Sequence, residues 1–251
     1  MTTPARILTI AGSDCSGGAG LQADLKTIIM LGGYGMSAIT AITAQNTLGV
    51  YAVEALSAQM VGAQIDACMD DIGVDAVKIG MLGSAPIAHA VADRLERLGV
   101  PVVFDPVMIA TSGGVLADGA TIEAFARLMA VATLTTPNVP ELAALGGAEA
   151  LVARGIPFLA KGGDAEGPVV EDCLYLPDAD KRIWQSERID TRHTHGTGCS
   201  LASAIATGLG QGMDLVAAVE RGRTFVRAAL LAAPGFGGGH GPLGHETVKG
   251  I

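Results

Sequence analysis

The sequence of 251 residues contains no apolar stretch as long as the roughly eighteen residues that a membrane-spanning helix requires. Its first residues lead straight into a strand-like segment at 7–10 and lack the charged, apolar and cleavage segments of a secretion signal. Charged residues make up only 16% of the chain, and the net charge of −9 disfavours non-specific binding to nucleic acid. We therefore expect a cytoplasmic protein that binds neither membranes nor nucleic acid.

Cysteines are few and scattered, with neither a C-x-x-C pair nor a cysteine–histidine spacing typical of a metal site. They lie at positions 15, 68, 173 and 199, a pattern that favours reduced thiols over a disulfide framework. The chain also lacks a proline- or serine-rich linker and internal repeats. Because 49% of its residues are hydrophobic, enough for a sizeable core, we expect a single domain over residues 1–251.

Short apolar segments alternate with segments of helical periodicity along most of the chain. Strands are expected at 7–11, 36–44, 50–56, 75–80, 102–105, 134–136 and 156–161, followed by a hairpin at 169–176 and 182–189. Helices are expected at 21–31, 58–72, 84–98, 119–130, 198–212 and 214–232, with one more beginning after Asn138. This alternation predicts a three-layer α/β sandwich, with helices on both faces of a mostly parallel sheet and a small antiparallel hairpin added. The glycine-rich tail at 234–242 is expected to be a loop over a ligand or a frayed end.

The most informative segment is the glycine-rich turn that begins at His195 and leads into the helix at 198–212. Gly196 and Gly198 permit a tight turn with exposed amides, and the first turn of a helix leaves amides unpaired and partly positive. The segment therefore predicts an anion hole for a phosphate or a transferring phosphoryl group. At this helix start the pKa of Cys199 is expected to be lowered, so that it serves as a base or nucleophile. A buried, inert cysteine is the alternative that the motif leaves equally open.

Two common nucleotide-binding signatures are not found. The chain has no G-x-x-x-x-G-K-[ST] segment. A dinucleotide fingerprint is approached at 18–23, but no acidic residue occurs between Asp24 and Glu54, where one would bind the ribose. A nicotinamide-dependent oxidoreductase therefore ranks last among the candidate functions.

Polar residues stand instead where three predicted strands end. Asp105 ends one strand, Asn138 and Glu141 follow the next, and Lys161 ends the last. In a parallel sheet these ends share one edge with the turn at 196–199. Oxygen ligands suit Mg²⁺, and a lysine suits a nucleotide phosphate. Each residue also has a structural alternative (a helix cap, a turn before a proline, a solvated strand end), but their convergence predicts a phosphoryl-transfer site.

Eight segments occur in the order and at the spacing of a known enzyme family. They are the segments at 11–20, 22–26, 43–47, 78–82, 105–108, 136–141, 161–163 and 195–199. On these motifs the chain resembles the hydroxymethylpyrimidine/phosphomethylpyrimidine kinases of thiamine biosynthesis, in the ribokinase superfamily. The resemblance implies a ribokinase-like fold and a homodimer. It also implies an enzyme that uses ATP and Mg²⁺ to phosphorylate 4-amino-5-hydroxymethyl-2-methylpyrimidine and then its monophosphate.

The resemblance further implies roles for single residues. Gln45 would hydrogen-bond the aminopyrimidine edge, which suits an amide because it can both donate and accept. Gly12 and Asp24 would line that pocket, and Met81 would pack on the ring. Cys199 would help to activate the acceptor oxygen. The catalytic residues that the resemblance implies are Gly196, Thr197, Gly198, Cys199 and Lys161. The residues implied to bind the nucleotide are Lys161, Asn138, Glu141 and Gly198. The residues implied to hold Mg²⁺ and its waters are Asp105, Asn138 and Glu141.

Two features depart from the family pattern. Cys15 stands where a proline or serine is more usual, and the segment at 145–158 is shorter than usual, which should alter a peripheral helix rather than the chemical centre. His193 and His195 are expected to be structural or solvent-facing, and His89 to lie on the surface or in packing. Two other functions stay open: a pyridoxal or related vitamin kinase on the same fold, and a non-catalytic vitamin-binding or regulatory protein.

Overall fold

The computed structural model describes residues 3–109, 114, 116–177 and 180–251. Its centre is a nine-stranded sheet with the order β3-β2-β1-β4-β5-β6-β7-β8-β9. The strands are β1 (Arg6–Asp14), β2 (Tyr34–Asn46), β3 (Gly49–Ala55), β4 (Ala76–Ile79), β5 (Val102–Phe104), β6 (Leu134–Thr135), β7 (Phe158–Ala160), β8 (Val169–Tyr175) and β9 (Lys181–Glu187). The six central strands, β2-β1-β4-β5-β6-β7 in sheet order, pair in parallel. At the two edges, β3 on one side and β8 and β9 on the other add antiparallel pairs. The predicted mostly parallel sheet with an added hairpin is confirmed.

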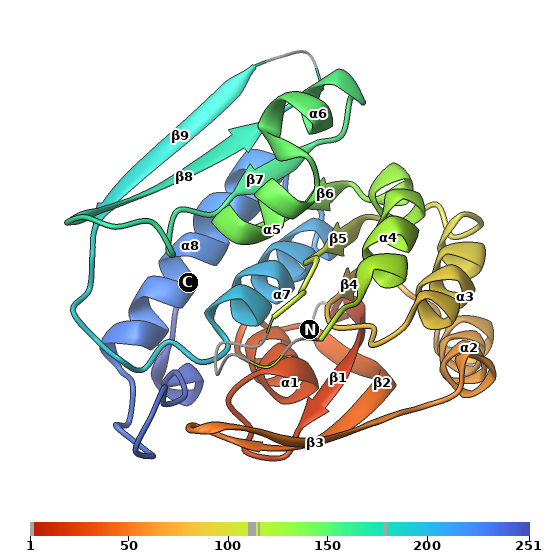
Figure 1. The fold of residues 1–251 in the computed structure, drawn as a ribbon, viewed down its shortest axis with the longest axis horizontal. Coiled ribbons are helices and arrows are strands. Elements are labelled where there is room, and N and C mark those ends of the chain that lie inside the picture. Colours follow the sequence, from red (N-terminus) through yellow and green to blue (C-terminus); the bar gives the residue numbers. More distant parts are fainter. Residues whose placement is uncertain (1–2, 110–113, 115, 178–179) are drawn as a thin grey trace.

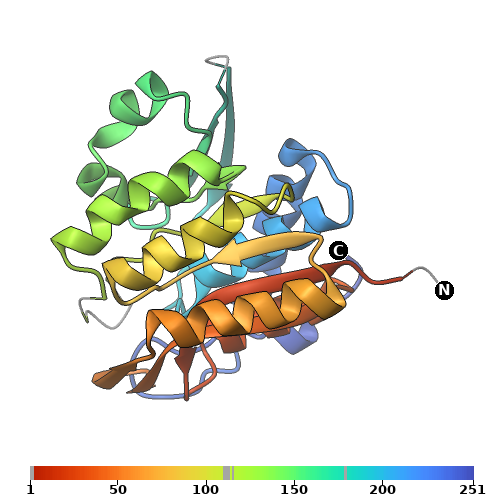
Figure 2. The same cartoon turned by 90° about the vertical axis from the view of Figure 1, so that its right-hand side faces the viewer.

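Helices cover both faces of this sheet, as Figures 1 and 2 show. One face carries α2 (Ala58–Ala67), α3 (Ala85–Leu95) and α4 (Gly119–Val131), and the other carries α1 (Gly20–Met30), α7 (Thr197–Gly210) and α8 (Leu215–Leu231). Two short helices, α5 (Val139–Ala144) and α6 (Gly147–Ala153), lie between β6 and β7. The three-layer sandwich is therefore confirmed. None of the described helices is both long and apolar enough to cross a bilayer.

The strand sequences explain why the sheet sits in the middle. A parallel strand between two helical layers is buried on both faces, so it needs a continuous apolar run rather than alternation. In β1, Leu8 and Ile10 pack into the core beneath α2, α3 and α4, whereas Ile7 packs on the opposite side with Ile205 of α7. The large apolar side chains of β1 thus contribute to two separate cores, one on each face of the sheet.

Local chemistry fixes where several helices begin. Asp118 and Asp214 accept hydrogen bonds from the first turns of α4 and α8. Asn138 and Glu141 form a reciprocal capping box at the start of α5. Ser84 precedes α3, but its side chain makes no capping hydrogen bond.

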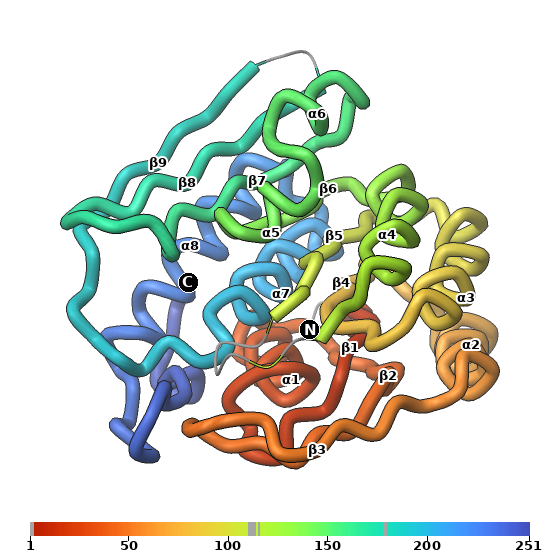
Figure 3. Tube along the Cα trace, in the orientation of Figure 1, coloured from red at the N-terminus to blue at the C-terminus, as the bar shows by residue number. Residues whose placement is uncertain are grey.

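Three segments refine the sequence-based expectations. The helix expected over 58–72 is divided, because α2 ends at Ala67 and residues Cys68–Ile72 form a π-helical turn. The shortened segment at 145–158 still contains the two turns of α6. The tail is a loop and not a frayed end, since the His240 amide donates to the Thr47 carbonyl and the Gly241 carbonyl accepts from the His195 amide. The tube in Figure 3 shows this last segment returning beside the loop that follows β2.

Candidate active site

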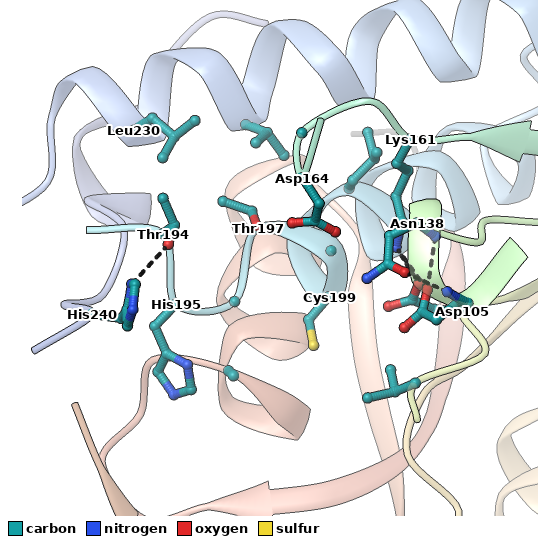
Figure 4. A pocket seen from close by; sticks show the side chains of 18 of the residues that line it. Asp105, Asn138, Lys161, Asp164, Thr194, His195, Thr197, Cys199, Leu230 and His240 are labelled. Atoms are coloured by element: carbon teal, nitrogen blue, oxygen red, sulfur yellow. Dashed lines mark hydrogen bonds and ion pairs between the residues drawn. The ribbon is translucent and has the colours of Figure 1, made fainter. Parts of the chain in front are cut away.

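A cavity of about 710 Å³ opens along the carboxyl ends of the parallel strands. It is lined by every sequence-predicted site residue except Asp24: Gly12, Gln45, Met81, Asp105, Asn138, Glu141, Lys161, Gly196, Thr197, Gly198 and Cys199. The predicted convergence on one sheet edge is therefore what the fold produces. In Figure 4 Cys199 lies in the middle of the cavity, with His195 on one side and Asp105 on the other.

The start of α7 has the geometry of an anion hole. Gly196 adopts a left-handed conformation with φ of 89°, and a Cβ there would lie 2.0 Å from the Gly18 carbonyl oxygen, so only glycine fits. The Thr197 amide donates to the Thr194 carbonyl at 3.3 Å. Within the described part of the chain, nothing accepts a hydrogen bond from the amides of Gly198 or Cys199. These two amides are free to bind an anion.

The thiol of Cys199 corrects one expectation. Its pKa is raised to about 11 because the thiolate would be largely removed from water; the nearby Lys78 ammonium opposes this rise, and the Asp24 and Asp105 carboxylates add to it. Desolvation of the charged form thus outweighs the helix start that was expected to lower the pKa. The resting side chain is a neutral thiol.

Acidic and basic groups alternate at the other side of the cavity. Lys161 Nζ lies 2.7 Å from Asp105 Oδ1 and 3.8 Å from Glu141 Oε2, and the Thr136 hydroxyl donates to Asp105 at 3.0 Å. Burial raises the pKa of Glu141 to about 7, although Lys161 opposes the rise. One lysine therefore faces two buried carboxylates, which leaves this edge short of positive charge.

Asn138 and Glu141 both cap the start of α5 and line the cavity. The Glu141 amide donates to Asn138 Oδ1 at 2.9 Å, and the Asn138 amide donates to Glu141 Oε2 at 2.8 Å, yet both residues also line the cavity. Across the described residues, no group of three or more acidic, histidine or cysteine side chains is arranged to hold a metal ion directly. A divalent cation at this edge would depend on water and phosphate oxygens for the rest of its coordination.

The opposite end of the cavity combines an amide with an apolar surface. Gln45 Nε2 donates to the Thr43 hydroxyl at 2.8 Å, and the Gln45 carbonyl accepts from Cys15 Sγ at 3.2 Å. Met81 lies against Gly12, where a Cβ would come within 2.8 Å of its Sδ. Gly12 therefore makes room for the thioether that forms one wall.

Asp24 does not line the cavity, contrary to the sequence-based expectation. Its carboxylate is fully buried and accepts hydrogen bonds from Lys78, from Thr9 at 2.6 Å and from Ser203 at 2.8 Å. It holds α1, β1, β4 and α7 together beneath the cavity floor. The carboxylate therefore supports the cavity floor and is not among the groups that line the cavity.

Sequence reasoning missed several groups at the end of the cavity beside β8, β9 and α8. This end is lined by Asp172 of β8, by Arg188, which directly follows β9, and by Arg223 and Arg227 of α8. Asp172 accepts from the Gly162 amide at 3.0 Å and from Arg223 at 2.7 Å, so it fixes the loop that carries Lys161. No local motif marks these residues, because the antiparallel hairpin brings them together.

Three histidines have different environments in the structure. His195 is 3% exposed and its Nε2 lies 2.9 Å from Asp14 Oδ2, which agrees with the structural expectation, and the residue also lines the cavity. His89 is on the surface, as expected. His240, which the sequence analysis did not single out, lines the cavity and lies 3.3 Å from the Thr194 hydroxyl.

Comparison with known proteins identifies the family. The family model for phosphomethylpyrimidine kinase matches residues 14–244. The hydroxymethylpyrimidine/phosphomethylpyrimidine kinase of Streptomyces coelicolor is 44% identical and covers 99% of this chain and 97% of its own. The enzyme of the same name from Rhizobium meliloti is 45% identical, with coverage of 95% and 96%.

Solved structures agree on the fold. Pyridoxal kinase from Bacillus subtilis, solved as an ADP complex, has a TM-score of 0.88 at 32% identity and covers 97% of this chain and 98% of its own. Phosphomethylpyrimidine kinase from Clostridium difficile has a TM-score of 0.75 at 37% identity, with coverage of 89% and 98%. With the cavity, the free amides at α7 and the matched motifs, these similarities make the chain a member of the phosphomethylpyrimidine kinase family.

Proposed function

We propose that this protein transfers the γ-phosphoryl group of ATP to 4-amino-5-hydroxymethyl-2-methylpyrimidine and then to its monophosphate, in thiamine biosynthesis. The observation that carries the proposal is the arrangement within one cavity. The free amides of Gly198 and Cys199 lie between an amide-and-thioether end at Gln45 and Met81 and a charged edge at Lys161. Two relatives that are 44% and 45% identical to this chain bear the name of this activity.

The Gln45 end suits an aminopyrimidine. The Gln45 amide oxygen has no hydrogen-bond partner among the described residues, so it can accept from an exocyclic amine while Nε2 donates to a ring nitrogen or stays with Thr43. Met81 supplies a polarizable apolar wall for the ring. An analogue without the amine would leave the amide oxygen unpaired, which gives discrimination of about 1–3 kcal/mol.

The centre of the cavity suits phosphoryl transfer. The amides of Gly198 and Cys199 would stabilise the charge on the transferring group, and Gly196 sets the turn that aims them. Lys161 would contact a nucleotide phosphate, and Cys199 would help to activate the attacking hydroxyl. The protein's task is thus to position two substrates and to stabilise the charge of the transferring group.

A divalent cation fits the charged edge. Asp105 and Glu141 are buried carboxylates that share the ammonium of Lys161, and burial, with the Asp105 carboxylate nearby, raises the pKa of Glu141 to about 7. Asp105, Asn138 and Glu141 would hold Mg²⁺ and its waters here. When bound, the ion supplies charge neutralisation for the phosphates of ATP.

The test is product analysis after incubation with pyrimidine and Mg²⁺-ATP. We expect the monophosphate and then the diphosphate. Cys199→Ala should lower kcat about 10²-fold or more and change the pyrimidine KM little. Cys68→Ala, outside the cavity lining, is the matched control and should retain activity. ATP turnover without phosphorylated pyrimidine would contradict the proposal.

Gln45→Ala separates binding from chemistry. Loss of the amide should raise the KM for the aminopyrimidine by about 5- to 150-fold, which corresponds to 1–3 kcal/mol, with kcat less affected. The comparison substrate is an analogue without the amino group, whose KM should not respond to this change. An equal loss for both substrates would remove Gln45 from amine recognition.

Pyridoxal phosphorylation is the second candidate, favoured by one observation. The solved pyridoxal kinases superimpose on this chain better than the phosphomethylpyrimidine kinase does, with TM-scores of 0.88 and 0.75. Sequence identity instead favours the phosphomethylpyrimidine kinase, at 37% compared with 32% for the pyridoxal kinase. A comparison of kcat/KM for pyridoxal and for the hydroxymethylpyrimidine decides between the two functions, and we expect the higher value for the pyrimidine.

We further propose that residues 1–251 form one domain and that the protein is a cytoplasmic homodimer. A single continuous sheet supports the first point. The outer edge of the sheet supports dimerisation, because Leu48, Tyr51 and Val53 are exposed apolar side chains at β3 and its turn. Sedimentation equilibrium measures the assembly, and Tyr51→Lys, at this edge, should shift a dimer toward monomer.

A further inference from the structure

His245 is a buried histidine near the end of the chain, and the site described above gives it no role. It begins η2 (His245–Thr247), a single 3-10 turn, and is 1% exposed. Its ring lies beside Phe225 of α8, with the ring centroids 6.2 Å apart. Leu243 and Val248, on either side of it in the sequence, belong to the same apolar cluster as Phe225. A polar ring in such surroundings needs a hydrogen-bond partner.

That partner is Ser200, in the first turn of α7. Ser200 Oγ lies 2.7 Å from His245 Nε2 and donates to the Gly196 carbonyl oxygen at 2.8 Å. Both side chains are buried. A serine hydroxyl has one hydrogen, and in Ser200 this hydrogen is given to Gly196. His245 Nε2 must therefore carry a hydrogen of its own and donate it to Ser200 Oγ.

The other ring nitrogen of His245 agrees with this assignment. Burial lowers the pKa of His245 to about 4, so the ring is neutral at pH 7 and carries one hydrogen. Nδ1 is buried and has no hydrogen-bond partner among the described groups, although the Leu243 carbonyl would stabilise a protonated ring. A buried N–H without a partner is rarer than a buried acceptor without one, which favours the hydrogen on Nε2. The hydrogen bonds thus run in one direction, from the ring through the hydroxyl to the Gly196 carbonyl.

The Gly196 carbonyl controls the direction of the amides that follow it. It shares one rigid peptide plane with the Thr197 amide, at the first residue of α7. It accepts from the Ser200 amide at 2.9 Å as well as from the Ser200 hydroxyl. Two hydrogen bonds therefore fix this plane, and the free amides of Gly198 and Cys199 follow it within the same helical turn.

We propose that His245 is a positioning residue for phosphoryl transfer, which holds the Gly196 peptide through Ser200 and so aims the free amides of α7 into the cavity. A serine in a helix can turn its hydroxyl to the carbonyl four residues earlier or away from it. The buried N–H of His245 holds the first of these orientations. The effect on catalysis rests on the proposed function, whereas the effect on anion binding does not.

The first experiment titrates inorganic phosphate into ¹⁵N-labelled protein and follows the amide resonances of Gly198 and Cys199. His245→Phe removes the N–H and keeps a ring, whereas His245→Gln keeps an N–H donor at about the reach of Nε2. We expect His245→Phe to raise the phosphate Kd about threefold or more. His245→Gln should stay within about twofold of wild type.

Thr207→Val is the matched control on the same helix. It removes another fully buried hydroxyl of α7, which donates at 2.7 Å to the carbonyl of Ser203, four residues earlier. No histidine is bonded to this hydroxyl among the described residues. The phosphate Kd of Thr207→Val should equal that of wild type.

Three results of these measurements overturn the proposal. They are equal phosphate affinity in wild type and His245→Phe, no phosphate binding in either, and equal loss in His245→Phe and His245→Gln, since a residue that only fills space is not rescued by an N–H. The ¹⁵N shifts of the His245 ring should show the hydrogen on Nε2, and a hydrogen on Nδ1 overturns the proposal too. Should His245→Phe fail to fold, Ser200→Ala breaks the same chain of hydrogen bonds and should weaken phosphate binding equally.

Turnover gives the second measurement. His245→Phe should lower kcat about tenfold and leave the pyrimidine KM within about twofold, because the amides act on the transferring group. The double variant His245→Phe/Ser200→Ala should be no slower than the slower single variant, since both changes break one chain. An unchanged kcat in an active His245→Phe enzyme overturns the proposal. Phosphate binding with the expected pattern, but no phosphorylated pyrimidine, would instead refute the proposed function and support the positioning role.

Discussion

Two glycines at opposite ends of α7 allow the anion hole to be tested with a matched control. Gly196 and Gly212 both adopt left-handed conformations, with φ of 89° and 85°. A Cβ at Gly212 would have no neighbour within 4 Å, whereas a Cβ at Gly196 would lie 2.0 Å from the Gly18 carbonyl oxygen and 3.0 Å from its carbon. Alanine at either position costs about 1–2 kcal/mol for the left-handed backbone, and only Gly196→Ala adds a collision.

That collision cannot be relieved by a side-chain rotation, because both partners are backbone. The loop before α7 must move away from the loop after β1, which raises the cost of Gly196→Ala to about 3–4 kcal/mol. For a chain of this size each kcal/mol lowers Tm by about 2–4 °C. The movement also displaces the amides of Gly198 and Cys199, and loss of one such donor lowers kcat about 10²-fold or more.

The assay measures Tm and kcat for both variants under the same conditions. We expect Gly212→Ala to lower Tm by a few degrees and to keep the wild-type kcat. Gly196→Ala should lower Tm further and should also lower kcat. The reasoning is refuted if the two variants have the same Tm and the same kcat, because a shared backbone strain would then be the whole effect.

Two buried titratable groups give pH-dependent predictions of opposite sign. The pKa of Glu141 is raised to about 7 by burial. The stability linked to its neutral form is therefore present below about pH 4.5 and is lost as the pH rises through 7. Thermal unfolding at pH 5 and 8 should show that the free energy of unfolding of Glu141→Gln gains up to about 3 kcal/mol on wild type over this range. The pKa of His245 is lowered to about 4 by burial, so stability is present above about pH 6.5 and is lost as the pH falls. His245→Gln should therefore gain on wild type between pH 7 and 4 by a similar amount, and parallel pH curves for variant and wild type would contradict either prediction.

The fold was predictable because its signals are local. Continuous apolar runs such as the one through Ile7 and Leu8 indicate strands that are buried on both faces. Once the sheet is parallel, the topology alone carries Asp105, Asn138 and Lys161 to one edge. Sequence order and strand direction were sufficient for this much of the site.

The parts that sequence reasoning missed depend on distant partners. Asp24 belongs to a motif that suggests a pocket residue, but its carboxylate is drawn beneath the floor by Lys78, 54 positions later in the chain. The Cys199 thiol sits at a helix start, yet its pKa is governed by desolvation and by the charges of Lys78, Asp24 and Asp105. Burial and long-range ion pairs are properties of the packed molecule, and no local pattern contains them.

The tail that joins Thr47 to His195 has a consequence for synthesis. Residues that line the cavity run from Ala11 to His240, and the hydrogen bonds of His240 and Gly241 fasten the rim. A growing chain therefore completes the sheet before residues 240 and 241 can fasten the rim. A chain that ends between the phosphate-binding turn at 196–199 and residue 240 would therefore carry that turn without the fastened rim.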